Sequence, residues 1–208
     1  MDEKVLTPLT LNTPSPWSKT LVEALQPFAT TQSYRKGIRL DFVETDEPLC
    51  RLIINGSVEV HRTADHLLMV RVPATRILGL GISGCYIVTA EPCKIATLTL
   101  EEAHQHIQEL GLWEVLAKHM VVVSSKLFFY SRQLSAPTAY EVICCQLIEL
   151  MHEPESLRKT LSVERFIRDR THLSRSSIMK ILADLKLGGY ISIENGRLMA
   201  IHHLPQKY

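Results

Sequence analysis

The sequence predicts an α+β fold in three parts: a domain of short β-strands, a long amphipathic helix, and a helix-turn-helix followed by a β-hairpin. Short aliphatic runs separated by turn residues between positions 34 and 100 are typical of β-strands. Apolar residues spaced by three and four through Gly111–Leu134 favour a long helix. Residues 161–202 contain a helix cap and a turn dipeptide, and their pattern predicts a helix, a turn, a second helix and a hairpin in that order. The predicted domains are 1–110, 111–135 and 136–208.

The first part is expected to be a β-domain that follows an arm with three prolines and one helix, Ser18–Phe28. Asn55-Gly56 is a strong turn signal between two of the strands. Many short strands with regular turns indicate a β-sandwich, a jelly roll or a barrel. A short helix, Glu101–Ile107, is expected to follow the strands. The expected strands are 38–42, 52–54, 58–60, 67–72, 86–89 and 94–98.

The long helix contains an apolar a/d seam that is maintained for about three heptads. The seam residues are Trp113, Leu116, Met120, Val123, Leu127, Tyr130 and Leu134. This pattern predicts a parallel two-fold dimer in which each helix packs against its copy. The alternative is a core helix that packs only within its own chain. Pro137 ends the helix and creates a short hinge.

The last part predicts a DNA-binding surface on one helix. Ser174 is a good N-cap, and an apolar face recurs from Ile178 to Leu185, so the helix is expected to be buried on that side. The opposite face is polar and basic, and such a helix can lie in a DNA major groove. A second Asn-Gly dipeptide, Asn195-Gly196, predicts the hairpin that forms the wing. The predicted DNA-binding residues are Ser174, Arg175, Ser176, Ser177, Met179 and Lys180.

Charge distribution agrees with this surface. Between Arg158 and Gly188 there are eight basic and three acidic residues, so this span has a net charge of +5 in a chain of net charge +1. Phosphate binding requires local positive charge rather than a basic whole protein. The alternative interpretation of the charge alone is a solvated helix face.

Other functional classes receive little support from the sequence. No apolar run approaches the roughly 18 residues that a bilayer span requires, and the N-terminus does not resemble a secretory signal, so a cytoplasmic protein is predicted. The five cysteines favour buried reduced thiols, although Cys85 and Cys93 flanking one hairpin are a candidate redox pair. Metal-ligand spacings and catalytic constellations are absent from the sequence, which predicts neither a metal, a cofactor nor an enzyme.

Two motifs and the order of the parts resemble the CRP/FNR family of bacterial transcription regulators. The segment 52–60 is similar to the family pattern I-x-x-G-x-V-x-V, and the segment 173–182 is similar to L/C-S-R-E-T-V-x-R-x-L. The resemblance covers about residues 34–202 and implies a cyclic-nucleotide-binding-like jelly roll, a dimerisation helix and a winged helix-turn-helix. It also implies a homodimeric regulator of transcription that binds double-stranded DNA, with RNA polymerase as a candidate partner. Arg175 matches the first base-reading arginine of the family.

The chain also departs from the family pattern. Ser176 replaces a base-reading glutamate, Lys180 lacks the planar fork of arginine, and His172 replaces a turn glycine. Gly79 is followed by leucine rather than glutamate, and segment 84–87 contains no arginine, so no cyclic nucleotide is expected. The first cysteine is at position 50, so an N-terminal iron–sulfur cluster is not expected either. The alternative function is a protein-interaction module that kept this fold and lost DNA binding.

Overall fold

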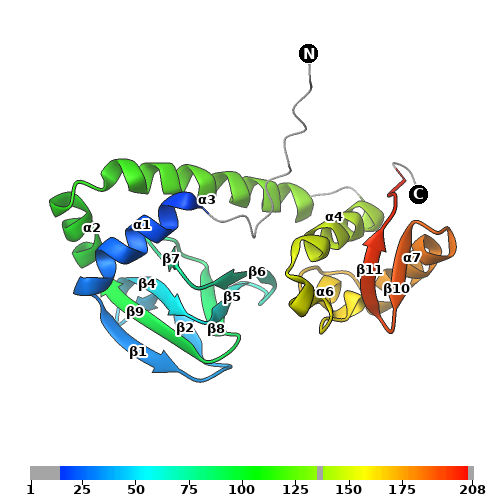
Figure 1. Ribbon diagram of the computed structural model, residues 1–208, viewed down its shortest axis with the longest axis horizontal. Helices are drawn as coiled ribbons and strands as arrows, with labels where there is room; N and C mark the ends of the chain where they lie inside the picture. Colours follow the sequence, from blue (N-terminus) through cyan, green and yellow to red (C-terminus); the bar gives the residue numbers. More distant parts are fainter. Residues whose placement is uncertain (1–14, 135–137, 206–208) are drawn as a thin grey trace, which may run out of the picture. The chain divides into compact units, whose positions relative to one another are not determined.

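The computed structural model describes residues 15–134 and 138–205, and it divides between Ser125 and Lys126 into two compact units. The N-terminal unit contains nine strands and the start of the long helix, and the C-terminal unit contains the helix-turn-helix (Figure 1). The boundary lies inside the helix that the sequence predicts as a separate segment. Residues 7–14 of the predicted proline-containing arm and hinge residues 135–137 lie outside the described residues, whereas Pro16, the last residue of the predicted arm, begins helix α1 (Pro16–Leu25).

Two antiparallel sheets form the N-terminal unit. One has the order β1-β9-β4-β3, with β7 also paired to β4, and the other has the order β2-β8-β5-β6. The strands are β1 (Thr30–Tyr34), β2 (Arg39–Asp41), β3 (Val43–Glu44), β4 (Glu47–Asn55), β5 (Ser57–Arg62), β6 (Leu68–Pro73), β7 (Arg76–Leu78), β8 (Cys85–Thr89) and β9 (Cys93–Thr99). The helices are α1 (Pro16–Leu25), the 3-10 helix η1 (Gln26–Phe28), α2 (Leu100–Glu109) and α3 (Trp113–Leu134).

The N-terminal unit has two apolar layers on either side of β4. Ile53 of β4 belongs to the cluster between the sheets, with Val58, Val60, Ile87 and Ile95. Cys50 and Leu52 point to the other face, where α1, α2 and the start of α3 cover the sheet. Because side chains alternate along a strand, a strand buried on both faces is nearly all apolar, as β4 is from Leu49 to Ile53 apart from Arg51.

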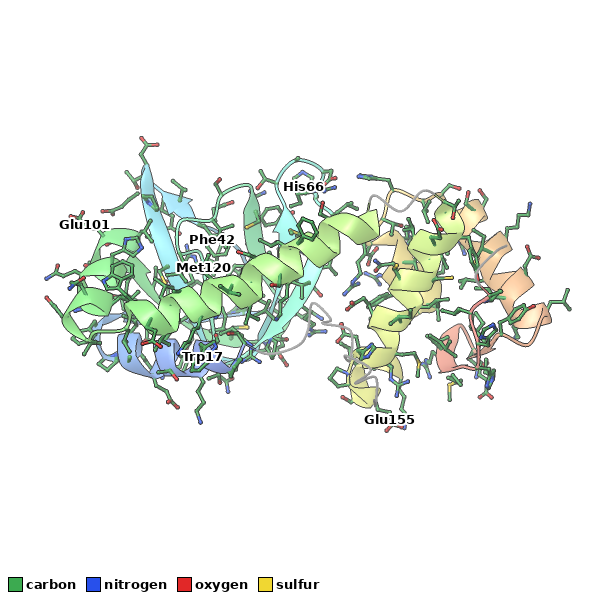
Figure 2. The ribbon with its side chains drawn as sticks, turned by 90° about the horizontal axis from the view of Figure 1, so that it is seen from above. Trp17, Phe42, His66, Glu101, Met120 and Glu155 are labelled. Atoms are coloured by element: carbon green, nitrogen blue, oxygen red, sulfur yellow. The ribbon has the colours of Figure 1, made fainter. Side chains whose placement is uncertain are left out.

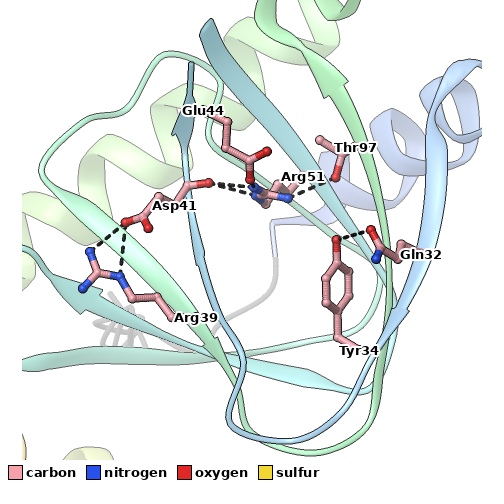
Figure 3. A network of polar contacts seen from close by, with 7 residues as sticks. All are labelled: Gln32, Tyr34, Arg39, Asp41, Glu44, Arg51 and Thr97. Atoms are coloured by element: carbon pink, nitrogen blue, oxygen red, sulfur yellow. Dashed lines mark hydrogen bonds and ion pairs between the residues drawn. The ribbon is translucent and has the colours of Figure 1, made fainter. Parts of the chain in front are cut away.

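Arg51 is the exception in that run, with only 2% of its side chain exposed. Its guanidinium donates to the Asp41 carbonyl oxygen at 2.8 and 3.1 Å and to Thr97 Oγ1 at 3.2 Å, and it pairs with Glu44 (Figure 3). A buried charge is stable only when it is paired and hydrogen-bonded. Since Asp41 belongs to the other sheet, these bonds tie the two sheets together.

The two Asn-Gly dipeptides have different roles. At Asn195-Gly196 both residues have positive φ, 47° and 76°, as the tight turn of a hairpin requires. At Asn55-Gly56 the flanking strands β4 and β5 pair in different sheets, so the expected turn is a corner between sheets rather than a hairpin. A Cβ on Gly56 would lie 2.6 Å from the Pro92 carbonyl oxygen, which explains the glycine.

The predicted seam of α3 does not form one exposed face. Leu116 is 8% exposed and lies in the core of the N-terminal unit, and Met120 packs against the same cluster. Val123 is half-buried, Tyr130 is buried, and Trp113 and Leu127 are each 43% exposed. The side chain of Leu134 lies outside the described residues. Leu116 is therefore used inside the protomer, and the assignment of the seven residues to one dimer seam stays a prediction.

The exposed apolar face of α3 is rotated from the predicted seam. Ala117, Val121, Ser124 and Phe128 follow one another at spacings of four, three and four and are all exposed. Val121 is 66% exposed and Phe128 is 78% exposed. Met120 of α3, which packs against the core of the N-terminal unit, is labelled in Figure 2. We call these four residues the outer face of α3.

The C-terminal unit has three main helices, one further helical turn and a hairpin around one core. The elements are α4 (Ala139–His152), α5 (Glu155–Arg158), α6 (Val163–Arg168), α7 (Arg175–Leu187), β10 (Ile191–Glu194) and β11 (Arg197–Ile201). The core contains Ile143, Leu147, Ile167, Ile178 and Leu185, each 0% exposed. Thr138 caps α4 with a capping box to Glu141. The helix-turn-helix and the wing are therefore confirmed as parts of the fold.

Candidate nucleic-acid interface

The rotation of α7 about its axis is fixed by its cap and its core face. The Ser174 Oγ accepts a hydrogen bond from the Ser177 backbone N–H at 3.2 Å, which satisfies a donor that the helix leaves free. The apolar face is buried as the sequence predicts, in Ile178, Ile181, Leu182 and Leu185. The opposite face of α7 must therefore point to solvent.

That face contains the residues predicted to contact DNA. The Arg175 side chain is 75% exposed, and Met179 is 48% exposed. Ser174, Ser176 and Lys180 are exposed, and Ser177 is half-buried. The structure thus brings all six together on the cap and first two turns of one helix. Guanidinium donors, hydroxyls and an apolar tip are groups that suit base edges and thymine methyl groups.

The turn before α7 needs no glycine. His172 is exposed and is not among the described residues with positive φ. The family pattern has a glycine at this position, but His172 does not adopt the left-handed backbone conformation that favours glycine, so the histidine carries no backbone strain. Thr171 supports the turn instead, because its Oγ1 donates to the Ile167 carbonyl oxygen at 2.8 Å and accepts from the Leu173 N–H at 3.4 Å.

The wing is anchored to the helix-turn-helix through backbone atoms. The Val163 N–H at the start of α6 donates to the Gly196 carbonyl oxygen at 2.9 Å. This bond holds the tip of the hairpin beside the N-terminus of α6. Arg197 follows the tip and is exposed. Arg197 is not among the residues predicted to contact DNA, although its position next to the Asn195-Gly196 turn is visible in the sequence.

Two sets of ion pairs formed by α6 and its C-cap were not predicted from the sequence either. Glu164 Oε1 lies 2.9 Å from Arg168 Nη1 and 3.9 Å from Arg175 Nε. Arg165 Nε lies 3.4 Å from Asp169 Oδ2. Their i, i+4 spacing within α6 is visible in the sequence. The contact from Glu164 to α7 is not, because it depends on how the two helices pack.

Two arginines near the segments that the family uses to bind a cyclic nucleotide make hydrogen bonds within the protein. Arg71 Nε donates to Ser57 Oγ at 3.2 Å, and that hydroxyl donates to Glu91 at 2.6 Å. Arg76 donates to the Thr75 carbonyl oxygen at 2.8 Å, and burial lowers the pKa of its guanidinium. Both arginines therefore already have hydrogen-bond acceptors within the protein. The expectation that the chain binds no cyclic nucleotide stays a prediction.

The structure separates the candidate redox cysteines. Cys85 pairs with Arg62 across β8 and β5, whereas the Cys93 thiol donates to the Ser57 carbonyl oxygen at 3.2 Å. Ser57 and Arg62 lie at opposite ends of β5, which are about 16 Å apart at roughly 3.3 Å per residue, so the two cysteines lie beside opposite ends of this strand. A disulfide needs Cα atoms within about 7 Å. These two thiols cannot pair directly in this fold.

Four of the described thiols are also poorly activated. Burial raises the pKa of Cys85, Cys93 and Cys144, and it raises the pKa of Cys50 to about 12. The thiolate is the form that attacks oxidants and alkylating agents. High thiol pKa values therefore indicate slow reaction in the folded state.

Alkylation of Cys50 is expected to be about a thousandfold slower in the folded protein than in denaturant, because its pKa rises from 9.0 to about 12. Iodoacetamide labelling at pH 8 followed by peptide mass spectrometry measures both rates. The raised pKa also stabilises the fold below pH 9, and this contribution is lost as the pH rises towards 12. Equal labelling of Cys50 in both states would contradict the burial argument.

Two kinds of feature are missing from the part of the chain that the structure describes. Among residues 15–134 and 138–205, no three His, Cys, Asp or Glu side chains gather in a way that could hold a metal ion. Within the same ranges, no helix is both long enough and apolar enough to span a membrane.

Comparisons with known proteins agree with this geometry. A family model for winged helix-turn-helix DNA binding matches residues 139–206. The chain is 30% identical over 189 residues to the inhibitor of hydrogen peroxide resistance of Salmonella typhimurium, an alignment that covers 84% of this chain and 91% of that protein. The Escherichia coli K12 protein of the same name is 32% identical over 112 residues, which cover 54% of this chain and 51% of that protein.

Solved structures show the same fold. CLP of Xanthomonas campestris, described as a c-di-GMP responsive global regulator, matches with a TM-score of 0.67 at 17% identity over 88% of this chain and 98% of that chain. A CooA variant from Carboxydothermus hydrogenoformans matches with a TM-score of 0.66 at 16% identity over 89% of this chain and 87% of that chain. A regulator of the CRP/FNR family from Eubacterium rectale matches with a TM-score of 0.58 at 13% identity, over 93% and 92% of the two chains. Likeness at these identities shows the fold and confirms the fold that the sequence resemblance implied.

Proposed function

Because the chain belongs to the family of the inhibitor of hydrogen peroxide resistance, we propose that it is a sequence-specific DNA-binding regulator of transcription that acts as a homodimer. The observation that carries the proposal is the solvent-facing side of α7, where Arg175, Met179 and Lys180 are exposed on a helix whose other side is fixed in the core. A helix held in this way beside a wing fits the major groove of duplex DNA.

Each group on α7 has a distinct part in the proposed contact. The forked guanidinium of Arg175 suits the O6 and N7 acceptors of guanine, whereas Lys180 offers a point charge without a fork. The exposed thioether of Met179 suits the methyl group of thymine. The hydroxyls of Ser174 and Ser177 suit phosphate oxygens, which set the register of the helix rather than the base sequence.

The outer face of α3 is proposed as the dimer surface. Ala117, Val121, Ser124 and Phe128 form an exposed stripe along a continuous helix, and exposed Leu127 borders it. In a parallel two-fold dimer, whose axis runs along the paired helices, each of these residues would lie near its own copy. The dimer would then present two α7 helices to half-sites about one turn of DNA apart.

The name of the relatives suggests the direction of control. We infer that the chain restrains a response that protects against hydrogen peroxide, as a repressor in an oxidative-stress pathway. Cys50 and Cys93 are buried, and burial raises the pKa of both thiols. These properties argue against direct oxidation of these two cysteines as the input signal.

Duplex binding at increasing salt tests the proposed function. A preferred duplex is first selected from a random library with the wild-type protein, and its affinity is compared with that of a scrambled duplex by fluorescence anisotropy. About six phosphate contacts predict a slope near −5 for log K against log salt. Equal, salt-insensitive affinity for both duplexes would favour the protein-interaction module instead.

A further inference from the structure

We propose that Glu164 is a positioning residue for Arg175, because it orients the guanidinium of Arg175 towards the bases. It also weakens the nonspecific binding of Arg168 and Arg175 to phosphates. The inference rests on the proposed DNA-binding function. It concerns a residue on the supporting helix α6, outside the base-reading helix, and it explains why an acidic group lies beside a surface that binds a polyanion.

Glu164 connects the two helices of the helix-turn-helix. Its Oε1 lies 2.9 Å from Arg168 Nη1 in α6 and 3.9 Å from Arg175 Nε in α7. The Glu164 side chain is only 15% exposed, whereas the Arg175 side chain is 75% exposed. The carboxylate is therefore held against the protein while the arginine extends over it into solvent.

The atom of Arg175 that faces the carboxylate decides what the arginine can do. The contact is made by Nε, at the base of the guanidinium. The two terminal amino groups, Nη1 and Nη2, are those that form a forked contact with guanine O6 and N7. A restraint at Nε leaves this fork available and reduces the rotamer freedom that Arg175 would lose on binding. Glu164 should therefore strengthen specific contacts.

The same carboxylate should weaken nonspecific contacts. Nonspecific binding depends on cations that neutralise phosphates, and it increases with the number of free cations. Glu164 partly neutralises Arg168 and Arg175, and it also repels phosphates directly. Because specific affinity rises while nonspecific affinity falls, both effects increase the ratio between the two.

A matched pair in α6 separates this role from a general effect of charge. Asp169 forms the second i, i+4 pair of the helix, with Arg165 at 3.4 Å, and its side chain is 41% exposed. Both Glu164→Gln and Asp169→Asn remove one negative charge from α6. Of these two acids, Glu164 is the one with an ion pair to α7.

The test measures the ratio of affinities for a duplex selected with wild-type protein and for a scrambled duplex. Glu164→Gln is expected to lower this ratio about three- to tenfold. This loss is smaller than the full discrimination that one arginine–guanine contact supplies, because the arginine itself is still present. It is also expected to steepen the salt slope on the scrambled duplex by about one. Asp169→Asn is expected to tighten both duplexes alike and leave the ratio unchanged.

Two further variants show that Glu164 acts through Arg175. In an Arg175→Ala background, Glu164→Gln is expected to leave the ratio unchanged, because its target is gone. Glu164→Asp keeps the charge but shortens the reach, so it should lower specific affinity without raising nonspecific affinity. Thermal unfolding checks that every variant is folded.

The outcomes separate the two hypotheses. A wild-type protein that prefers its selected duplex, with equal ratios in Glu164→Gln and Asp169→Asn, overturns the positioning role and leaves the proposed function standing. A wild-type protein without any duplex preference overturns the proposed function, and the positioning role with it.

Discussion

Replacing Arg175 with alanine is expected to remove most of the preference of the protein for its selected duplex. A forked contact between arginine and guanine contributes about 1–3 kcal/mol of discrimination. A two-fold dimer uses the residue twice, so the loss should reach roughly 2–6 kcal/mol if the half-sites act independently. The side chain is 75% exposed and lies outside the core, so the fold should be unaffected. Competition between selected and scrambled duplexes, with circular dichroism for folding, measures both effects.

Arg175→Lys is the control that separates charge from geometry. Lysine keeps the positive charge but lacks the planar fork. The variant should bind the scrambled duplex about as well as wild type and still lose much of the preference for the selected one. The assignment of Arg175 as a base reader fails if Arg175→Ala retains the full preference.

Replacing Val121 and Phe128 together with aspartate is expected to convert the dimer into monomers. The two residues are seven positions apart on α3, 66% and 78% exposed, and lie on its outer face. In a parallel two-fold dimer, whose axis runs along the paired helices, each aspartate would face its own copy, so like charges would replace apolar contacts. Loss of the second half-site should weaken binding to the selected duplex by roughly 10²–10⁴-fold. Sedimentation velocity gives the oligomeric state, and anisotropy gives the affinity.

Leu187→Asp is the matched control for the dimer surface. Leu187 is 90% exposed at the end of α7, so the change removes one exposed apolar side chain and adds one negative charge away from the outer face of α3. This variant should sediment as wild type does. If the Val121 and Phe128 double variant also keeps the sedimentation coefficient of wild type, the outer face of α3 is not the dimer surface.

Several features were predictable because they depend on neighbouring residues. The Ser174 cap, the buried stripe of α7 and the hairpin at Asn195-Gly196 follow from local hydrogen bonding and backbone preference. The six predicted DNA-binding residues also gather as expected, because one helix determines their relative positions. Strand β1 (Thr30–Tyr34) was missed because its residues are mostly exposed and show no apolar alternation.

Other features depend on contacts between distant parts of the chain. The i, i+4 spacing shows that Glu164 pairs with Arg168, but only the packing of α6 on α7 brings it to Arg175. Arg51 resembles an outward-facing strand residue in the sequence, yet it lies between the sheets because Asp41 supplies a backbone acceptor there. Cys85 and Cys93 are close in sequence, and the assignment of their strands to different sheets separates them.

The sequence by itself determined the order of the parts, the fold class and the face of α7 that points to solvent, because caps, turns and helical periodicity are local properties. Only the tertiary structure decided which side of α3 stays exposed, which Asn-Gly turn joins paired strands, and which acid restrains Arg175. Those outcomes depend on which surfaces cover one another, and the spacing of residues along a chain does not contain that information.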